Sequence, residues 1–443
     1  MKILILTYTN PINASGIVAY DLLIGLSSVD GNDVRILVRE WDKYEDNRIV
    51  TIETAFEHYL YAIIRRIKRF RKKTLKFIFN NYKTKDEKLK EKINSDYYFE
   101  YNMSETFYST KKILRRAGFR PEIIFVLFTP AFISFRNLHE ISILSSAHIF
   151  LYLMDMAPFT GGCHYAWDCT GYHNKCGNCP ALYSNLENDQ SRINWEFKNK
   201  FIQNTDLSVI YGSKWHYEQL LNCSLFSLKK KLKIPLRINT EIFKPGERDL
   251  AREYFNLPKE MKIILFAAVK IADKRKGFIE LIEALKCLKH NISNSEINNI
   301  HIIIAGQDAP ELTSQLPFPH KVLGYLNHNQ LASAFQATDI FVSPVIEDSG
   351  PMTVIQSLLC GIPVVSFDIG VAQDLVINGQ TGYKAVLMDS EGFANGIQSI
   401  LELDEISYRD IRSNCAKLSI EMFQKDKFYE YLKFAFSEVF KKN

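Results

Sequence analysis

The chain has 443 residues, 47% hydrophobic and 24% charged, which is ordinary for a globular protein of two or three domains. A formal net charge of +5 identifies no partner, and eight cysteines are too few for a disulfide scaffold. No stretch reaches the roughly 18 uninterrupted apolar residues of a membrane span. Met1–Thr9 is apolar but too short for a secretory signal. We therefore expect a cytoplasmic protein.

The first forty residues read as strand, loop, helix and strand. Lys2–Tyr8 is a buried strand, Thr9–Gly16 a polar loop, Ile17–Leu26 a helix and Asp33–Val38 a second strand. Such a βαβ unit predicts a parallel sheet. The loop lacks the G-x-G-x-x-G fingerprint of dinucleotide-binding proteins, and this weakens a dehydrogenase interpretation.

A basic stretch, Tyr59–Phe79, follows. Eight Lys or Arg lie between Arg65 and Lys76, interleaved with Ile63, Ile67, Phe70, Leu75 and Ile78. A basic amphipathic helix suits an anionic membrane surface. Nucleic acid is the competing polyanion, and a solvated helix face is the simplest alternative. We favour the membrane and expect no nucleic-acid partner.

Two successive α/β series complete the chain, separated by Lys229–Pro245, which reads as a crossover. Helices such as Phe278–Lys289 alternate with the strands of the second series. Further strands are expected at residues 122–128, 148–154, 207–211, 262–269, 300–305, 321–323, 339–342 and 363–366. The pattern predicts an α/β protein of two doubly wound, Rossmann-like domains.

Four cysteines cluster within the first series, spaced as C-x5-C-x6-C-x2-C: Cys163, Cys169, Cys176 and Cys179. Four thiolates close a tetrahedral zinc site with bonds of about 2.3 Å. The final C-x2-C is a common half-site, whereas the first pair is unusually wide. We favour structural zinc, with free thiols or an oxidation-prone pair as the alternatives.

Two segments of the second series have the character of an anion site. In Ser343–Ser366 a strand ends near Pro344, Glu347 and Asp348 follow in a loop, and a helix opens at Ser349-Gly350-Pro351. The free N–H groups and dipole of such a helix start favour phosphate. In Phe266–Phe278 another strand leads into a helix through four cations that could clamp a diphosphate: Lys270, Lys274, Arg275 and Lys276.

Together these segments resemble the retaining glycosyltransferases of the GT-B fold, family 4. The resemblance is strongest from about Leu232 to Tyr383, where seven pieces occur in the family's order: IPLRINTEIFKP, DKRKGF, AGQ, LGYLNHNQL, TDIFVSPVIED, CGIPVV and NGQTGY. It implies two Rossmann-like domains that face each other across a cleft. Residues 1–232 would bind the acceptor and carry a Cys-rich insertion at 155–185. Residues 233–422 would bind the nucleotide sugar, and a helix over 423–443 would pack back on the N-terminal domain.

The resemblance also implies residue roles. Lys270 and Lys276, with Arg275 as an alternate, would stabilise the departing diphosphate, which itself helps to deprotonate the acceptor. Glu347 or Asp348 would hold the donor sugar. Further donor-binding residues would be Gly324, Tyr325, Gly350, Pro351, Met352 and Gln356, and Gly16 matches the family's glycine on the acceptor side. A UDP- or GDP-sugar is then the donor, and no catalytic metal is needed.

Two positions depart from the family. The second glutamate of its Glu-x7-Glu pattern is Gln356 here, which can hydrogen-bond a ribose but has no charge. Where family members often end a strand with a His–Asp pair, Met154 precedes Asp155, leaving Asp155 as the catalytic candidate and His164 as a substitute histidine.

The resulting hypothesis is a retaining hexosyltransferase of bacterial surface polysaccharide biosynthesis. Its acceptor would be a lipid-linked saccharide, and it would lie peripherally on the inner face of the cell membrane. The alternative, motivated by Met154 and Gln356, is a catalytically weak nucleotide-sugar-binding partner subunit.

Overall fold

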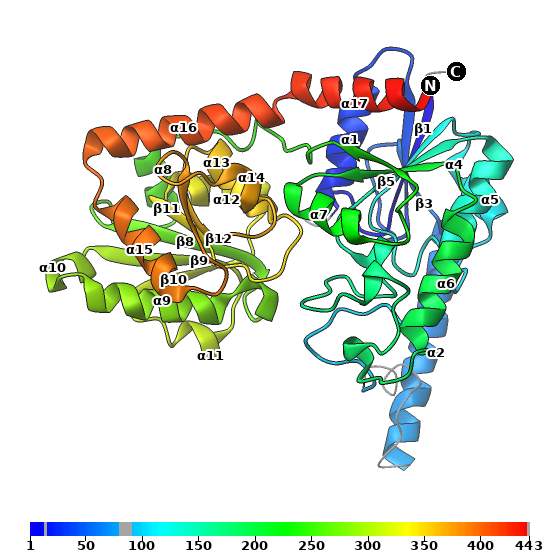
Figure 1. The fold of residues 1–443 in the computed structure, drawn as a ribbon, viewed down its shortest axis with the longest axis horizontal. Helices are drawn as coiled ribbons and strands as arrows, with labels where there is room; N and C mark the ends of the chain where they lie inside the picture. The colour runs from blue at the N-terminus through cyan, green and yellow to red at the C-terminus, as the bar shows by residue number, and fades with distance from the viewer. Residues whose placement is uncertain (13–15, 79–90, 441–443) are drawn as a thin grey trace. The chain divides into compact units, whose positions relative to one another are not determined.

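The computed structural model describes residues 1–12, 16–78 and 91–440 of the chain (Figure 1). The chain divides into two compact units. The first consists of Met1–Tyr211 with Gln219–Leu232, and the second of Gly212–Glu218 with Lys233–Asn443. Each unit is built around its own sheet.

The sheet of the first unit has seven strands. Their spatial order is β3 (Ile49–Thr51), β2 (Asp33–Val38), β1 (Lys2–Thr7), β4 (Ile123–Val126), β5 (His148–Tyr152), β6 (Leu207–Tyr211) and β7 (Lys230–Lys233). The pairings from β3 to β6 are parallel. The central strands are apolar runs buried on both faces, as Ile3–Leu6 of β1 shows, because helices cover both sides of a parallel sheet.

The helices of the first unit are α1 (Ile17–Ser27), α2 (Ala55–Ile78), α4 (Thr110–Ala117), α5 (Phe135–Ser145) and α6 (Gln190–Ile202), and α7 (Lys214–Asn222) straddles both units. Three short 3-10 turns follow β5: η1 (Ala157–Phe159), η2 (Gly171–His173) and η3 (Pro180–Leu182). The C-terminal half of α2 extends away from the sheet of this unit (Figure 1).

The sheet of the second unit has six parallel strands. Their order is β10 (His320–Gly324), β9 (Ile300–Gln307), β8 (Lys262–Lys270), β11 (Ile340–Ser343), β12 (Val364–Phe367) and β13 (Gly382–Ala385). The chain therefore starts at the centre with β8, winds outwards to β10, and then returns to build the other side from β11. This is the doubly wound order 3-2-1-4-5-6 of the Rossmann fold.

Helices α9 and α15 of the second unit pack on each other, and α13 packs on α12 and α16 (Figure 1). The described helices of this unit, with the 3-10 turn η4, are α8 (Arg248–Tyr254), η4 (Lys274–Lys276), α9 (Phe278–Asn291), α10 (Asn294–Ile297), α11 (Pro310–Thr313), α12 (His328–Gln336), α13 (Met352–Leu359), α14 (Ala372–Leu375), α15 (Ser390–Leu401), α16 (Glu405–Phe423) and α17 (Lys425–Phe440). A buried ion pair ties α8 to the start of β11, with Arg252 Nη2 2.7 Å from Asp339 Oδ2.

The predicted fold class is confirmed, since both series form doubly wound sheets. One expectation was wrong: Lys229–Pro245 is not only a crossover, because Lys230–Lys233 forms β7 at the end of the first sheet. Its sequence is KKLK, and only Leu232 is fully buried. An edge strand with one buried side chain has no apolar run or alternation to reveal it.

Across residues 1–12, 16–78 and 91–440, no helix is both long enough and apolar enough to cross a bilayer.

Candidate active site

The second sheet has its topological switch point between β8 and β11. The strand order reverses there, so the loops that follow these two strands leave the sheet in opposite directions. Open α/β sheets bind their ligands in the resulting crevice, outside the carboxyl ends of the strands. The loop after β8 carries the cations predicted from the sequence, and the loop after β11 carries Glu347 and Asp348.

The basic loop is a capped 3-10 turn. The side chain of Asp273 accepts a hydrogen bond from the backbone N–H of Arg275 at 3.2 Å, and Arg275 Nη2 lies 2.6 Å from Asp273 Oδ2. Gly277 ends the turn with φ of 68°, and a Cβ there would lie 1.6 Å from the Pro344 carbonyl oxygen. Glycine is therefore required at residue 277, because only glycine lets the two loops touch.

Contact between the loops brings Lys276 to Asp348. Lys276 Nζ lies 2.5 Å from Asp348 Oδ2, Arg275 Nη1 lies 3.9 Å from the same oxygen, and Asp348 Oδ1 accepts the Gly350 N–H at 3.0 Å. Asp348 is buried. Burial by itself raises the pKa of Asp348, but the charges of Lys276 and Arg275 and the Gly350 hydrogen bond outweigh it and hold this pKa below its usual range. Asp348 is thus a buried carboxylate.

Helix α13 begins directly after this loop. Pro351 stands at the N-cap and not inside the first turn, and no side chain caps the helix. Gly370, with φ of 59°, approaches the loop so closely that a Cβ would lie 2.8 Å from the Asp348 carbonyl oxygen. An uncapped helix N-terminus beside Lys276 and Arg275 provides backbone N–H groups and positive charge where a phosphate group can bind.

The other donor-side candidates take different positions at this edge of the sheet. Lys270 is exposed at the end of β8, and Glu347 is buried, its backbone N–H 3.5 Å from the Arg275 carbonyl oxygen. Gln356 is buried within α13, and Met352 is half-buried at its start. Gly324 ends β10 and the exposed Tyr325 follows it, two strands away from β8. The structure therefore brings Arg275, Lys276, Glu347 and Asp348 together and leaves Gly324 and Tyr325 at a distance of two strands.

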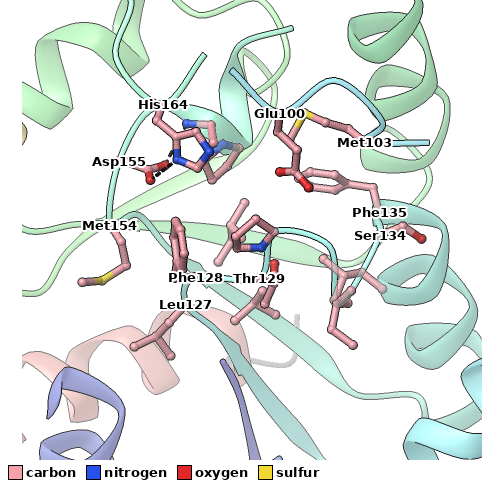
Figure 2. A pocket seen from close by; sticks show the side chains of 17 residues that line it. Glu100, Met103, Leu127, Phe128, Thr129, Ser134, Phe135, Met154, Asp155 and His164 are labelled. Carbon is pink, nitrogen blue, oxygen red and sulfur yellow. Dashed lines mark hydrogen bonds and ion pairs between the residues drawn. The ribbon is translucent and has the colours of Figure 1, made fainter. Parts of the chain in front are cut away.

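In the first unit, Asp155 is buried in the loop that follows β5 and pairs with His164. The distance between Asp155 Oδ2 and His164 Nδ1 is 2.7 Å, and Asp155 Oδ1 accepts the Ala157 N–H at 2.8 Å (Figure 2). Burial lowers the pKa of His164, but the charge and hydrogen bond of Asp155 outweigh it and raise this pKa. Met154, Asp155 and His164 all line one pocket (Figure 2).

Gly16 precedes α1, where a Cβ would lie 2.0 Å from the Asn10 carbonyl oxygen. Only glycine fits this turn, which is a structural reason for the residue independent of any ligand. Residues 13–15 of the same loop lie outside the described residues.

The four clustered cysteines line one small pocket and are free thiols. A hydrogen bond between the Cys163 and Cys179 thiols, together with burial, raises the pKa of Cys163, and burial raises the pKa of Cys176 to about 12. The donor chemistry fits zinc. As free thiols the four cysteines do not yet form a metal site: within the described part of the chain no group of three or more His, Cys, Asp or Glu is arranged to hold a metal ion. The zinc site stays a prediction.

The basic stretch forms α2, as expected. Residues 59–71 are exposed on every side of this helix, and Phe56, Ile67 and Phe70 are 75%, 62% and 74% exposed. The apolar residues follow the i, i+3, i+4, i+7 spacing of one helix face: Phe56, Tyr59, Leu60, Ile63, Ile67 and Phe70. The side chains of Lys72, Lys73, Leu75, Lys76 and Ile78 lie outside the described part of the structure.

Two doubly wound parallel sheets define the class of this molecule as the GT-B fold of glycosyltransferases. Residues 247–418, within the second unit, match the family model described as "Glycosyl transferases group 1". This stretch contains η4, the Glu347–Asp348 loop and α13.

Solved structures with the same fold cover almost the whole chain. Sucrose-phosphate synthase from Thermosynechococcus elongatus is 16% identical, with a TM-score of 0.66 and 99% of each chain covered. HepE from Anabaena, solved in complex with UDP, is 14% identical with a TM-score of 0.63, covering 99% of this chain and 100% of that one.

The curated relatives match over a shorter length. The D-inositol 3-phosphate glycosyltransferase of Mycolicibacterium smegmatis is 25% identical over 177 residues, which are 37% of this chain. The chain thus spans only 38% of the length of that relative.

Proposed function

We propose that the chain is a retaining hexosyltransferase that moves a sugar from a UDP- or GDP-sugar to a lipid-linked saccharide in bacterial surface polysaccharide biosynthesis. One observation carries the proposal. Lys276, Arg275 and Asp348 meet beside the N-terminus of α13 at the switch point of the second sheet, within the stretch that matches group 1 glycosyltransferases. This is the place where a Rossmann-like sheet binds a nucleotide diphosphate.

The chemistry assigned to this site is stabilisation of the departing diphosphate. Negative charge grows on the diphosphate as the bond to the sugar breaks, and preorganised cations lower the energy of that transition state. Lys276 is held in place by Asp348, while Lys270 extends from the end of β8. We assign both lysines to the diphosphate, with Arg275 as the alternate. The diphosphate then helps to remove the proton from the acceptor hydroxyl, and no catalytic metal enters the reaction.

The remaining roles follow from the contacts. We assign contact with the donor sugar to Glu347 or Asp348, the two buried carboxylates of the loop after β11. Gln356 is assigned to the ribose, to which its amide can both donate and accept hydrogen bonds. Its lack of charge predicts weaker donor binding than a glutamate would give.

The lipid-linked acceptor is supported by α2. An exposed apolar face flanked by cations is the arrangement of a helix that lies in a membrane interface. We propose that this helix docks the first unit on the anionic inner face of the cell membrane, where a lipid-linked saccharide is within reach.

A donor panel tests the proposal. UDP-glucose, UDP-galactose, UDP-N-acetylglucosamine and GDP-mannose are incubated with the full chain and membrane lipid extract, with and without EDTA, and released UDP or GDP is measured. Turnover with one donor, unchanged by EDTA and with the anomeric configuration retained in the product, is expected. Donor binding without turnover identifies the catalytically weak partner subunit instead. Failure of every donor and of UDP and GDP to bind contradicts both.

A further inference from the structure

The pocket of the first unit lies at the carboxyl ends of β4 and β5. Its floor and walls include Phe128, Thr129 and Phe135, and its polar groups are Glu100, Asp155 and His164. Figure 2 shows the Glu100 and His164 side chains on one side of the pocket, with Phe128 and Thr129 facing them. The cavity volume is about 50 Å³. This is space for a few water molecules, or for one hydroxyl-bearing edge of a larger molecule.

Two segments far apart in sequence bring the side chains of Glu100 and His164 together. Phe99 and Cys163 form an isolated antiparallel bridge, the Glu100 N–H donates to the Gly162 carbonyl at 2.8 Å, and the His164 N–H donates to the Tyr98 carbonyl at 2.9 Å. Glu100 and His164 therefore lie on adjacent backbone segments and enter the pocket side by side.

Glu100 and His164 are each held in place by one hydrogen bond to the protein. Glu100 Oε1 accepts the Ala131 N–H at 2.8 Å, and His164 Nδ1 donates to Asp155 Oδ2 at 2.7 Å. The second carboxylate oxygen of Glu100 and Nε2 of His164 have no hydrogen bond to the described residues and are the atoms that can meet a ligand. Fixing both side chains before a ligand arrives lowers the entropy that binding must overcome.

The charge of this pocket selects the ligand. Glu100 repels phosphate and carboxylate groups, the charge of Asp155 is paired with His164, and the buried Lys198 donates to the Ala157 and Thr160 carbonyls at 2.5 and 2.8 Å. A carboxylate accepts hydrogen bonds from hydroxyl groups, and aromatic rings pack against apolar C–H faces. A neutral polyhydroxylated ring offers both.

We propose that this pocket holds a hydroxyl-bearing edge of the acceptor sugar, with Glu100 and His164 Nε2 hydrogen-bonded to its hydroxyl groups and Phe128 or Phe135 against the ring. This inference rests on the proposed function, because it gives the first unit the acceptor. It names Glu100 and His164 as the residues that determine which neutral sugar is accepted.

The test uses the full chain and four probes: the methyl α-glycosides of glucose, galactose, mannose and N-acetylglucosamine. Binding is followed by saturation-transfer NMR, and UDP binding is measured separately by calorimetry. At least one glycoside is expected to bind the wild-type chain. Glu100→Gln should weaken that binding about 10-fold or more, because a hydrogen bond to a charged group is lost. Its amide oxygen can still accept the Ala131 N–H, so the fold is retained.

Glu105→Gln is the matched control, since Glu105 is exposed five residues further along. It should bind the glycosides as the wild type does, and urea unfolding should give the same midpoint for both variants. Undiminished glycoside binding by Glu100→Gln, or no glycoside binding by a wild-type chain that binds UDP, overturns the inference. A wild-type chain that binds neither UDP nor GDP overturns the proposed function instead.

Discussion

Lys276 Nζ lies 2.5 Å from Asp348 Oδ2, although the two residues are 72 positions apart in the sequence. Lys276 belongs to the loop after β8 and Asp348 to the loop after β11. Their ion pair therefore connects the two loops at the switch point of the second sheet.

Lys276→Ala should lower turnover by about 100-fold or more, because one preorganised donor to the leaving diphosphate is lost. It also leaves the buried Asp348 carboxylate with Arg275 as its remaining cation at 3.9 Å, so some stability is lost as well. Initial rates are measured well below the unfolding temperature. Lys259→Ala, which removes an exposed lysine of the second unit outside the basic loop, is the control and should stay close to the wild-type rate. Wild-type turnover by folded Lys276→Ala contradicts the assignment.

The Asp348 pair should make stability depend on pH. The pKa of Asp348 is lowered in the folded protein, so its stabilising contribution is present above the unfolded value of about 3.9 and is lost as pH falls through the folded pKa. At pH 7, Asp348→Asn should lower the unfolding free energy by about 3–5 kcal/mol. Urea unfolding at pH 7, 5, 4 and 3 should show the gap between wild type and variant narrowing with acid. A constant gap argues against an ionised Asp348.

Lys270→Ala separates catalysis from folding. Lys270 is exposed, so the unfolding free energy of the Lys270→Ala variant should stay within about 0.5 kcal/mol of the wild-type value. Turnover should nevertheless fall, because the side chain is assigned to the diphosphate. Urea unfolding measures the unfolding free energy, and steady-state kinetics measure turnover. Unchanged kcat and KM would remove Lys270 from the site, and the effect of Lys276 would be unaffected by that result.

One zinc per chain is expected, bound by the four cysteines of the pocket at Cys163, Cys169, Cys176 and Cys179. Binding would deprotonate the thiols and draw them into a tetrahedral set, which they do not form as free thiols. Metal content is measured on protein purified without a metal column. Cys176→Ser should reduce the zinc content, and Cys287→Ser, outside the cluster, should not. If the ratio of zinc to protein chain is near zero and four thiols of the native protein can be titrated, the cysteines are free.

The α2 helix should carry the chain to anionic liposomes. Co-sedimentation should require anionic lipid and fall as salt rises, because exposed charges are screened within about 8 Å at physiological ionic strength. Replacing Arg65, Arg66, Lys68 and Arg69 with Gln should release the chain, and Ile67→Ser with Phe70→Ser should weaken binding by removing the inserting side chains.

The matched control for membrane binding makes the same change in charge on exposed lysines of the second unit: Lys259, Lys286, Lys289 and Lys417. This variant should sediment with liposomes as the wild type does. Equal loss in both variants would indicate an effect of net charge alone. Equal retention in both would leave α2 as a solvated helix face.

The sequence by itself determined the two sheets and most of their strands. Apolar runs such as Ile3–Leu6 and Ile302–Ile304 are buried on both faces, and this local pattern is visible without any tertiary contact. Strand ends were displaced by one or two residues, as for β4 and β9, because hydrogen-bonded pairing and not apolar character sets where a strand stops. The cations and carboxylates at the switch point were also identified from the order of motifs.

Only the tertiary structure decided which of these residues meet. Asp348 is paired with Lys276 across 72 residues, and Glu100 lies beside His164 through a bridge between Phe99 and Cys163. Glu100 stands in a segment without a motif, so no sequence signal marked it. The short outer strands β3, β7 and β13 were also missed, because the place of an edge strand depends on its neighbour in the sheet, as β7 depends on β6. Local patterns specify elements, whereas contacts between distant loops depend on how the chain winds around its sheets.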